Sequence, residues 1–467
     1  MNTHTQPPPF FEASPGASYR VDELVVALAY DRVVLEQLIQ WNAAPLTDDR
    51  EYDEQVTGPK VDTRLALRRV PVKADQAVAH LRGEHGDWVE RATDGARDAG
   101  YASSDIDVLI RCLRYAFQRR FNGWVPGIGK NRLVSRPTGS YVIQGGGAPG
   151  PVPQPDYVIQ GGGATPGPVP QPDYVIQGGG GAPRPLPQPD YVIQGGGKGS
   201  APATVRRVVQ RRKAQPGAGV HIGVVDTPLG ENQWLAGGYL TTADALLPPN
   251  LNGQLPPSLD HSTFVVGMIL RQAPGATVVL RRGLGLDATS DSWSVARAIA
   301  DLASSSPAVV NLSLGCVTDD NQAPMVLTAA VNALGPHCLV VAAAGNHGAP
   351  NETPRPTWPA AMDSVVAVGA LDAQFRRAEF SPDATWVNAV APGVDVFSTV
   401  APLPGRGDVL FGTWSGTSFA AATVTGEIAA RVGPGTSATQ YWEGLQKGTS
   451  INVEGRPVFL PAPRDIS

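Results

Sequence analysis

The chain has 467 residues and a formal net charge of −5 at pH 7, with 42% hydrophobic and 17% charged residues. A chain of this length is longer than an ordinary domain with one hydrophobic core, so we expect two or three structural units. The weakly acidic balance argues against a nucleic-acid-binding protein and against a membrane-surface protein. The longest apolar runs, such as residues 338–344, are too short to span a bilayer.

The N-terminus and the cysteines indicate the compartment. The first residues read Met-Asn-Thr-His-Thr-Gln-Pro-Pro-Pro, without the basic start and apolar stretch of a secretory signal. The cysteines are Cys112, Cys316 and Cys338. Cys316 follows one predicted strand and Cys338 begins another, which in a parallel sheet are opposite ends, so no disulfide is expected. We therefore expect a cytoplasmic protein.

Residues 19–136 are predicted to form a small helical or α+β N-terminal domain, preceded by a Pro-rich, disordered stretch at residues 1–18. Apolar residues recur at helical spacing over residues 24–39 and again over residues 106–121. A short alternating stretch at residues 65–67 predicts a strand between them. This region carries no catalytic signature, and we interpret it as an adaptor domain.

Charge in the N-terminal domain is uneven. Residues 48–54 are rich in aspartate and glutamate, while residues 111–136 are rich in arginine and lysine. We interpret both stretches as solvated surface, and a docking face for a protein partner is the alternative.

A seven-residue motif, Tyr-Val-Ile-Gln-Gly-Gly-Gly, follows the N-terminal domain in four copies. The copies begin at Tyr141, Tyr157, Tyr174 and Tyr191. The spacers between copies are rich in proline and glycine, and each unit is too short and too glycine-rich to be a solenoid repeat. We therefore predict a disordered repeat linker at residues 137–204, followed by a basic connector at residues 205–216.

The remaining residues, 217–460, alternate between two patterns. Strand-like apolar runs lie at residues 220–225, 276–281, 307–312, 338–344 and 364–370. Helix-like stretches lie at residues 261–272, 291–304, 323–334 and 418–431. This alternation predicts an α/β domain with a mostly parallel sheet sandwiched by helices.

An aspartate and a histidine in this domain lie where acid–base chemistry could use them. Asp226 ends the apolar run at 220–225, which puts its carboxylate at the carboxyl edge of the sheet. His261 opens a helical run, where a neutral imidazole can act as general base. The carboxylate would hold one ring nitrogen of that imidazole and stabilise its charged form. Taken singly, a turn-starting aspartate and a structural histidine explain both residues as well.

A serine and an asparagine complete the set. Ser418 lies between Gly416-Thr417 and small residues at the start of a helical run, so a nucleophile there gains from free backbone N–H groups. Its own N–H can face a developing oxyanion. Asn346 follows a buried strand and a glycine, which suits a side-chain amide as the second oxyanion donor. The other interpretations are a helix N-cap for the serine and an ordinary turn for the asparagine.

Together these residues resemble the subtilisin-like serine peptidase family, which has the same chain order of aspartate, histidine and serine. The resemblance covers about residues 217–425. Its motifs are the Asp226 strand, His261-x-Thr263-x-Val265-x-Gly267, Asn311-Leu312-Ser313-Leu314-Gly315, Ala344-Gly345-Asn346, Trp358-Pro359-Ala360, Ala391-Pro392-Gly393 and Gly416-Thr417-Ser418. It implies a seven-stranded parallel sheet, a triad of Asp226, His261 and Ser418, and an oxyanion hole with Asn346.

The resemblance also implies that a peptide substrate adds to the enzyme as an extended strand. The implied substrate-binding residues are Leu312, Ser313, Leu314, Gly315, Ala344 and Gly345, with a second backbone segment before Asp291 that the sequence does not place. Pro228, Ser262 and Ala422 replace the glycine, glycine and proline usual in the family, and Ser262 is expected to narrow the cleft beside the imidazole. No cofactor is expected; the resemblance leaves calcium open, because relatives often carry it, but no acidic cluster in the sequence identifies a site.

Three interpretations of the whole chain compete. The first is an intracellular, regulated serine endopeptidase acting on a protein or peptide substrate. The second is a catalytically silent scaffold that uses the subtilisin fold to bind peptides. The third makes residues 1–200 an inhibitory propeptide of a secreted enzyme. We further hypothesise that the Tyr-Val-Ile-Gln segments dock in the protein's own cleft, favoured by the tether, with an inert linker or a separate partner as alternatives.

Overall fold

A computed structural model describes residues 10–43, 60–98, 103–136, 141–144, 157–160, 215–248, 251, 257–348, 353–401, 411–447, 452–453 and 455–459. It divides into two compact units. Unit 1 comprises residues 1–134, 290–300 and 316–333, and unit 2 comprises residues 135–289, 301–315 and 334–467. Two stretches of the predicted 217–460 domain therefore group with the N-terminal region.

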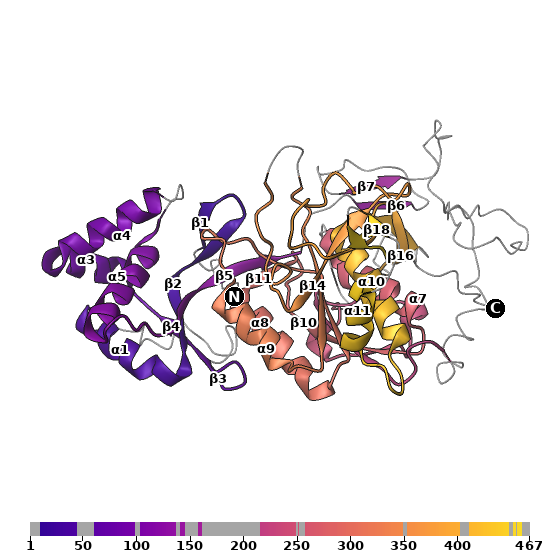
Figure 1. The fold of residues 1–467 in the computed structure, drawn as a ribbon, viewed down its shortest axis with the longest axis horizontal. Coiled ribbons are helices and arrows are strands. Elements are labelled where there is room, and N and C mark those ends of the chain that lie inside the picture. Colours follow the sequence, from indigo (N-terminus) through magenta and orange to yellow (C-terminus); the bar gives the residue numbers. More distant parts are fainter. Residues whose placement is uncertain are drawn as a thin grey trace, which may run out of the picture. The chain divides into compact units, whose positions relative to one another are not determined.

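Unit 1 is built on a mainly antiparallel sheet (Figure 1). The sheet order is β11-β5-β2-β4-β3, with β1 also paired to β2. Its strands are β1 (Phe10–Ser14), β2 (Ala17–Ala27), β3 (Val61–Asp62), β4 (Leu67–Pro71), β5 (Ile128–Ser135) and β11 (Thr289–Asp291). Its helices from the N-terminal region are α1 (Asp31–Gln40), α3 (Ala74–Glu84), α4 (Gly86–Asp98) and α5 (Asp105–Arg120).

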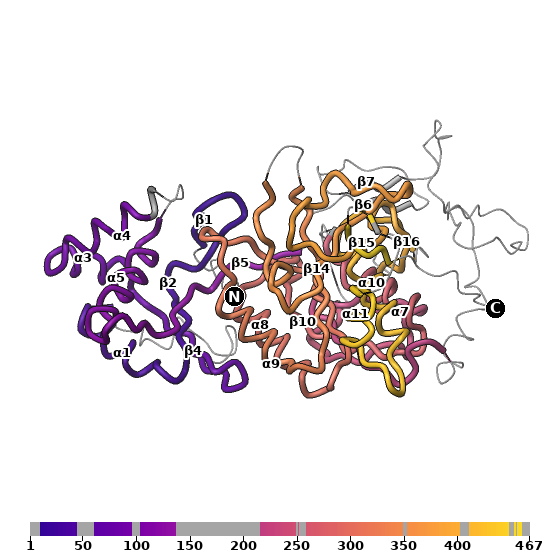
Figure 2. Tube along the Cα trace, viewed as in Figure 1, coloured from indigo at the N-terminus to yellow at the C-terminus, as the bar shows by residue number. Residues whose placement is uncertain are grey.

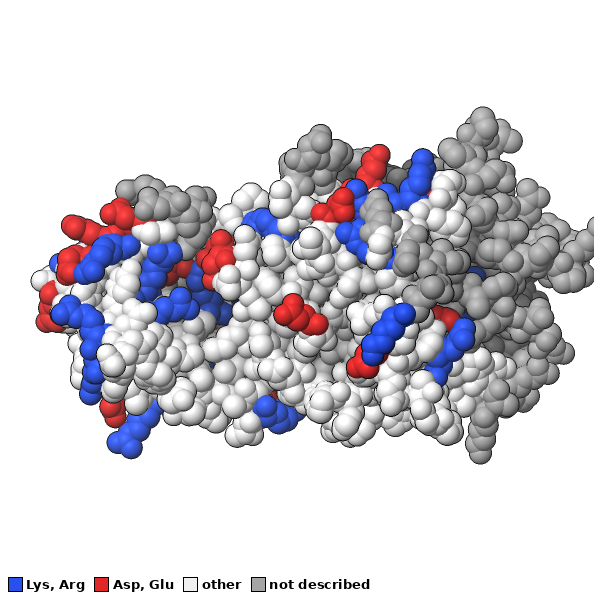
Figure 3. All heavy atoms as spheres, viewed as in Figure 1, with Lys and Arg blue, Asp and Glu red and all other residues white. Residues whose placement is uncertain are grey.

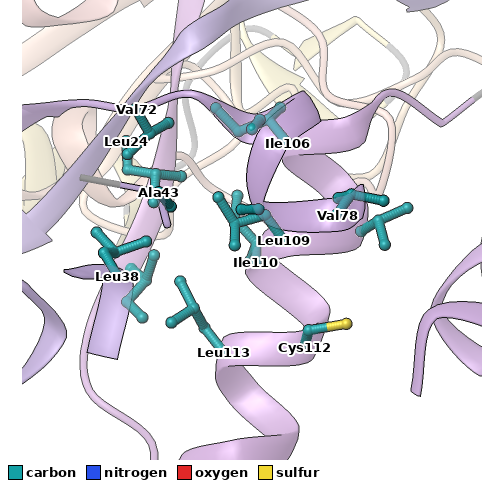
Figure 4. Close-up of a cluster of buried hydrophobic side chains, with 14 of the residues drawn as sticks. Leu24, Leu38, Ala43, Val72, Val78, Ile106, Leu109, Ile110, Cys112 and Leu113 are labelled. Carbon is teal, nitrogen blue, oxygen red and sulfur yellow. The ribbon is translucent and has the colours of Figure 1, made fainter. Parts of the chain in front are cut away.

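The core of unit 1 lies between the sheet and these helices. Figure 4 shows apolar side chains from β2, α1, α3 and α5 converging on one another. Leu24, Leu38, Leu81, Leu109 and Leu113 are all fully buried in this cluster. Burial of this kind contributes roughly 1.5–3 kcal/mol for each large apolar side chain.

Unit 1 corrects three predictions. The stretch at residues 10–18 is not disordered, because β1 and the start of β2 pair there, with Phe11 opposite Tyr19. The helix expected over residues 24–39 is a strand up to Ala27, and only its second half is the helix α1. The strand expected at residues 65–67 begins at Leu67 as β4. The helix expected over 106–121 is confirmed as α5.

Basic residues that were interpreted as solvated are partly buried in unit 1. Lys130 and Arg132 on β5 both pair with the carboxylate of Asp319, and the Lys130 Nζ to Asp319 Oδ2 distance is 2.7 Å. Burial alone would raise the pKa of Asp319, yet Arg132 and Lys130 hold it at about 2. Buried charges persist only when paired in this way.

Charged side chains of both signs intermingle over α3, α4 and α5 on the face drawn in Figure 3. Arg91 pairs with Asp87 along α4, and Arg32 pairs with Glu36 along α1 in the same way. Exposed pairs of this kind contribute little to stability, about 0.3–0.5 kcal/mol each. The acidic stretch at residues 48–54 lies outside the described residues.

Unit 2 contains the expected sheet of seven strands in the order β15-β14-β13-β12-β8-β10-β9. The strands are β8 (His221–Asp226), β9 (Tyr239–Leu240), β10 (Thr277–Arg282), β12 (Val309–Leu312), β13 (Leu339–Ala343), β14 (Val365–Leu371) and β15 (Ala389–Pro392). All of these pairings are parallel. The α/β prediction is confirmed, and five of the strands lie within a residue or two of the expected runs.

Helices and short elements complete the α/β region (Figure 2). The helices of unit 2 are α7 (His261–Gln272), α10 (Thr417–Arg431) and α11 (Ala438–Lys447). The helices α8 (Ser292–Leu302) and α9 (Met325–Ala333) lie in the two stretches that group with unit 1, except for the last two residues of α8. The remaining pairs of strands are β16 (Val396–Thr399) with β17 (Phe411–Trp414), and β18 (Asn452–Val453) with β19 (Arg456–Pro457). Helix α10 is buried along most of its length and contributes to two apolar clusters in unit 2.

Two copies of the repeat motif contain strands, where the sequence predicted disorder. The strand β6 (Tyr141–Gln144) is the first copy and β7 (Tyr157–Gln160) is the second. They extend the β16–β17 pair into a four-stranded sheet in the order β16-β17-β6-β7 (Figure 1). Residues 205–214 of the basic connector and the later two copies lie outside the described residues. Among the described residues, no helix is both long and apolar enough to cross a membrane.

Candidate active site

The structure brings Asp226 and His261 together at the carboxyl edge of the unit 2 sheet. Asp226 is the last residue of β8 and His261 is the first residue of α7. The distance from His261 Nδ1 to Asp226 Oδ1 is 2.7 Å, and both side chains are buried. The same carboxylate oxygen accepts the N–H of Thr227 at 2.7 Å. One ring nitrogen of the histidine is therefore fixed by a buried carboxylate.

The other ring nitrogen of His261 is buried without a hydrogen-bond partner, and so is Oγ of Ser418. Ser418 is the second residue of α10. Its neighbour Phe419 lies 5.8 Å from the imidazole, centroid to centroid, and Trp414 lies 5.6 Å from it in an edge-on arrangement. Unpartnered buried polar atoms cost free energy, and their presence in a folded protein calls for an explanation such as a catalytic role.

Asn346 is held by the residue just before the serine. Its Oδ1 accepts both the N–H and the hydroxyl of Thr417, each at 2.9 Å. Its Nδ2 is buried and has no partner. A Cβ built on Gly416 would lie 3.3 Å from that nitrogen, so the amide donor faces the turn that leads to Ser418. Thr417 thus orients an unused donor toward the start of α10.

Ser313 contacts the backbone of Ser418. Its hydroxyl lies within hydrogen-bond distance of the Ser418 carbonyl at 3.0 Å and of Asn311 Oδ1 at 2.9 Å. The Asn311 amide in turn donates to Thr425 Oγ1 on α10 at 3.0 Å. The end of β12 is therefore tied to α10 by buried polar contacts, which fix the helix start relative to the sheet.

The predicted substrate strand is already occupied by the protein's own chain. Gly315 and Ser135 exchange both backbone hydrogen bonds, at 2.8 and 3.0 Å. The N–H of Arg136 donates to the carbonyl of Ala288 at 3.2 Å. Ala288 lies shortly before Asp291, in the region where the family resemblance implies a second backbone segment. The short stretch Ser135–Arg136 thus runs between two backbone segments as an added strand.

Nothing in the sequence marked Ser135 and Arg136, because their contacts with these segments are made by backbone atoms. The side chain of Arg136 adds one contact, since its guanidinium carbon lies 5.4 Å from the centroid of the Trp414 ring. Such a cation–π contact is worth roughly 0.5–2 kcal/mol. Trp414 therefore borders both the imidazole and the inserted strand.

The other predicted substrate-binding residues lie as follows. Leu312 ends β12, and Leu314 is fully buried. Ala344 donates its N–H to the carbonyl of Val368, while the N–H of Gly345 is bonded to Thr417 Oγ1 at 3.1 Å. The structure thus links Gly345 to the serine turn and does not place a peptide against either residue.

The three departures from the family pattern have local explanations. The Ser262 hydroxyl donates to the carbonyl of Pro228 at 2.8 Å, so two of the departures contact each other. Ser262 is fully buried and its hydroxyl is used in this contact. Ala422 packs within an apolar cluster on α10.

Burial shifts the pKa of several ionisable side chains elsewhere in the chain. Burial lowers the pKa of His347, whose Nε2 lies 2.8 Å from the carbonyl of Arg355. Cys112, Cys316 and Cys338 are free cysteines, and burial raises the pKa of Cys316 to about 12. Among the described residues, no group of three or more His, Cys, Asp and Glu side chains is arranged to hold a metal ion.

The region that contains Asp226, His261 and Ser418 is similar to known proteins. Residues 217–437 match the sequence model of the "Subtilase family". The "Thermophilic serine proteinase" of Bacillus sp. (strain AK1) is 34% identical over 43% of this chain and 46% of its own length. "Subtilisin E" of Bacillus subtilis is 32% identical over 36% of this chain and 44% of its own length. This chain therefore spans less than half the length of these two relatives.

"Subtilisin BL" of Lederbergia lenta is 31% identical over 49% of this chain and 83% of its own length. A solved structure described as a "cold adapted subtilisin-like serine proteinase" covers 54% of this chain and 91% of its own, at 24% identity and a TM-score of 0.44. From the family match and the extensive alignment with Subtilisin BL, the chain belongs to the subtilase family.

Proposed function

We propose that the protein is a serine endopeptidase whose substrate strand is blocked by a segment of its own chain. The observation that carries the catalytic part is the buried Asp226–His261 pair, with the second ring nitrogen and the Ser418 hydroxyl both unpartnered. A folded protein that needed no chemistry here would satisfy these polar atoms or replace them. The names of the relatives support the same reaction class.

The chemistry follows from these groups. His261 removes the proton of the Ser418 hydroxyl as the oxygen attacks the peptide carbonyl, and later gives the proton to the leaving amine. Asp226 stabilises the charged imidazolium and fixes its tautomer. The free Nδ2 donor of Asn346, with the backbone N–H of Ser418, receives the developing negative charge on the carbonyl oxygen.

The binding mode is strand addition along Leu312 to Gly315. The two hydrogen bonds between Ser135 and Gly315 support it, because an extended segment of the chain itself already pairs with this edge. A substrate peptide would take the same antiparallel hydrogen bonds to Gly315 and to Ala288. Ser135–Arg136 and a substrate therefore compete for one position.

This competition supplies the regulation. The segment is continuous with β5, so it is always present at a high local concentration. The blocking segment favours the interpretation of the N-terminal region as an inhibitor over its interpretation as an adaptor alone. The same segment lies in the position that we hypothesised for the Tyr-Val-Ile-Gln copies. A cytoplasmic location, a protein partner for the N-terminal region and a role for calcium stay predictions.

The second candidate is a silent peptide-binding scaffold. The occupied strand position favours it as well, since binding alone needs no nucleophile. The two candidates differ in whether Ser418 reacts, which a direct chemical test decides.

The test is intact mass spectrometry of the wild-type protein and of Ser418→Ala after exposure to a fluorophosphonate probe. One adduct that maps to Ser418 and is absent from the variant supports the peptidase. Wild-type fragments cut between Arg136 and Tyr141, absent from the variant, would also support cleavage of the blocking segment. A protein that stays unlabelled and uncut even after residues 1–136 are removed, yet binds extended peptides in that form, would overturn the peptidase in favour of the scaffold.

A further inference from the structure

The first copy of the repeat motif is attached to the strand that leads into the nucleophile. β6 pairs antiparallel with β17, with Val142 opposite Thr413 and Tyr141 opposite Trp414. The other edge of β17 is taken by β16. Trp414 is followed after three residues by Ser418, so the first copy covers the edge of the strand beside the candidate active site.

The second copy adds to the first in register. β7 lies parallel to β6, and each residue lies beside its identical counterpart: Tyr157 beside Tyr141, and so on to Gln160 beside Gln144. Identical segments stacked in parallel register give the same backbone ladder and the same row of side chains at every step. The added edge of β7 therefore presents the same sequence that β6 presented to it.

The spacers have the length that such a stack requires. Parallel neighbours need a connection of about a dozen residues or more to return to the starting end. The chain offers residues 145–156, 161–173 and 178–190 between successive copies. Each spacer begins with glycines, which permit the sharp turn out of a strand.

We propose that all four copies form one parallel stack that is seeded on β17. The third and fourth copies, residues 174–177 and 191–194, are the occupants of the β7 edge, each adding beyond the last. In the part of the chain that the structure describes, β7 ends this sheet. The repeat is thus a β-sheet extension of the catalytic unit and not a free tether. This inference does not depend on the peptidase proposal, because it concerns backbone pairing alone.

Amide hydrogen exchange in the full-length Ser418→Ala protein tests the stack, since this background excludes self-cleavage. The four copies can be told apart because their spacers differ in sequence. We expect the copy amides to exchange at least about tenfold more slowly than those of a free chain, as strand amides do. Exchange at the free-chain rate in all four copies would overturn the proposal.

A matched pair of proline variants tests the order of the stack. Val142→Pro with Ile143→Pro removes a donor from each edge of the first copy, because successive N–H groups of a strand point to opposite edges. We expect all four copies to lose protection. Val192→Pro with Ile193→Pro in the fourth copy should release that copy alone.

Two further outcomes contradict the proposal. Loss confined to the substituted copy in the first variant would mean that β17 does not seed the others. Protection that rises with protein concentration, together with a dimeric mass by light scattering, would mean that copies from two chains pair with each other.

Discussion

Replacing Ser135 by proline tests the blocking strand directly. Proline lacks the N–H that Ser135 donates to the carbonyl of Gly315 at 3.0 Å, but its fixed φ angle suits an extended strand. The preceding Val134 is already in β5, which is the conformation that a following proline requires. The substitution therefore removes one contact of the added strand without demanding another backbone path.

The size of the effect follows from the contact that is lost. Gly315 is buried, so in the Ser135→Pro variant its carbonyl lacks a hydrogen-bond donor as long as the blocking segment stays in place. An unsatisfied buried backbone group costs about 1–3 kcal/mol. This cost lowers the equilibrium constant between the blocked and the open position of the segment about 5- to 150-fold. The hydrogen bond of Arg136 to Ala288 remains, so the segment is weakened and not removed.

The assay is the rate of fluorophosphonate labelling at Ser418, followed by intact mass so that only uncut molecules are counted. Ser135→Ala is the matched control, because it keeps the backbone N–H and changes only the side chain. We expect the proline variant to label about 5- to 150-fold faster than the alanine variant. Equal labelling rates in two equally stable variants would refute the blocking role of this strand.

Three other predictions concern the site and its support. Asn346→Asp keeps the acceptor for Thr417 but loses the Nδ2 donor. Peptide turnover should fall about 10²–10³-fold, which is the loss known for subtilisin when one oxyanion donor is removed, while the thermal unfolding temperature should change little. Gly315→Ala would place a Cβ 2.7 Å from Thr357 Cγ2, so urea unfolding in the Ser418→Ala background should reveal a loss of about 1–3 kcal/mol, and unchanged stability would contradict the close packing. The pKa of Asp319 is lowered to about 2 in the folded state, so its stabilising contribution is complete above the unfolded pKa of about 4 and should disappear as pH falls from about 4 to 2. The free energy of unfolding of the parent should therefore fall more steeply over this range than that of Asp319→Asn, and an equal fall in both proteins would rule this out.

The sheet of unit 2 was predictable because the burial of its strands also produces the apolar runs in the sequence. Parallel strands buried on both faces read as continuous apolar runs, and β8 and β13 lie within such runs. Asp226 and His261, which the structure brings together, could be marked from the sequence because each lies at the end of an element whose boundary the pattern marks. Ser418 was found in the same way, at the start of α10.

The N-terminal region was harder for a physical reason. In β2 the consecutive residues Leu24, Val25 and Val26 are all buried, so the strand has no clean alternation and merges with the apolar positions of α1. The blocking stretch was missed for another reason. Backbone hydrogen bonds such as those of Ser135 can be made by almost any residue, so they leave no signature in the sequence.

Helix α10 places Ser418, the proposed nucleophile, within the hydrophobic core of unit 2. Phe419 and Ala422 belong to one apolar cluster of unit 2, while Ala420 and Val424 belong to the other. Ser418 reaches its final position only when both clusters have formed around this helix. Under the proposed function, peptide bonds can therefore be cut only by molecules in which the core of unit 2 has packed around α10.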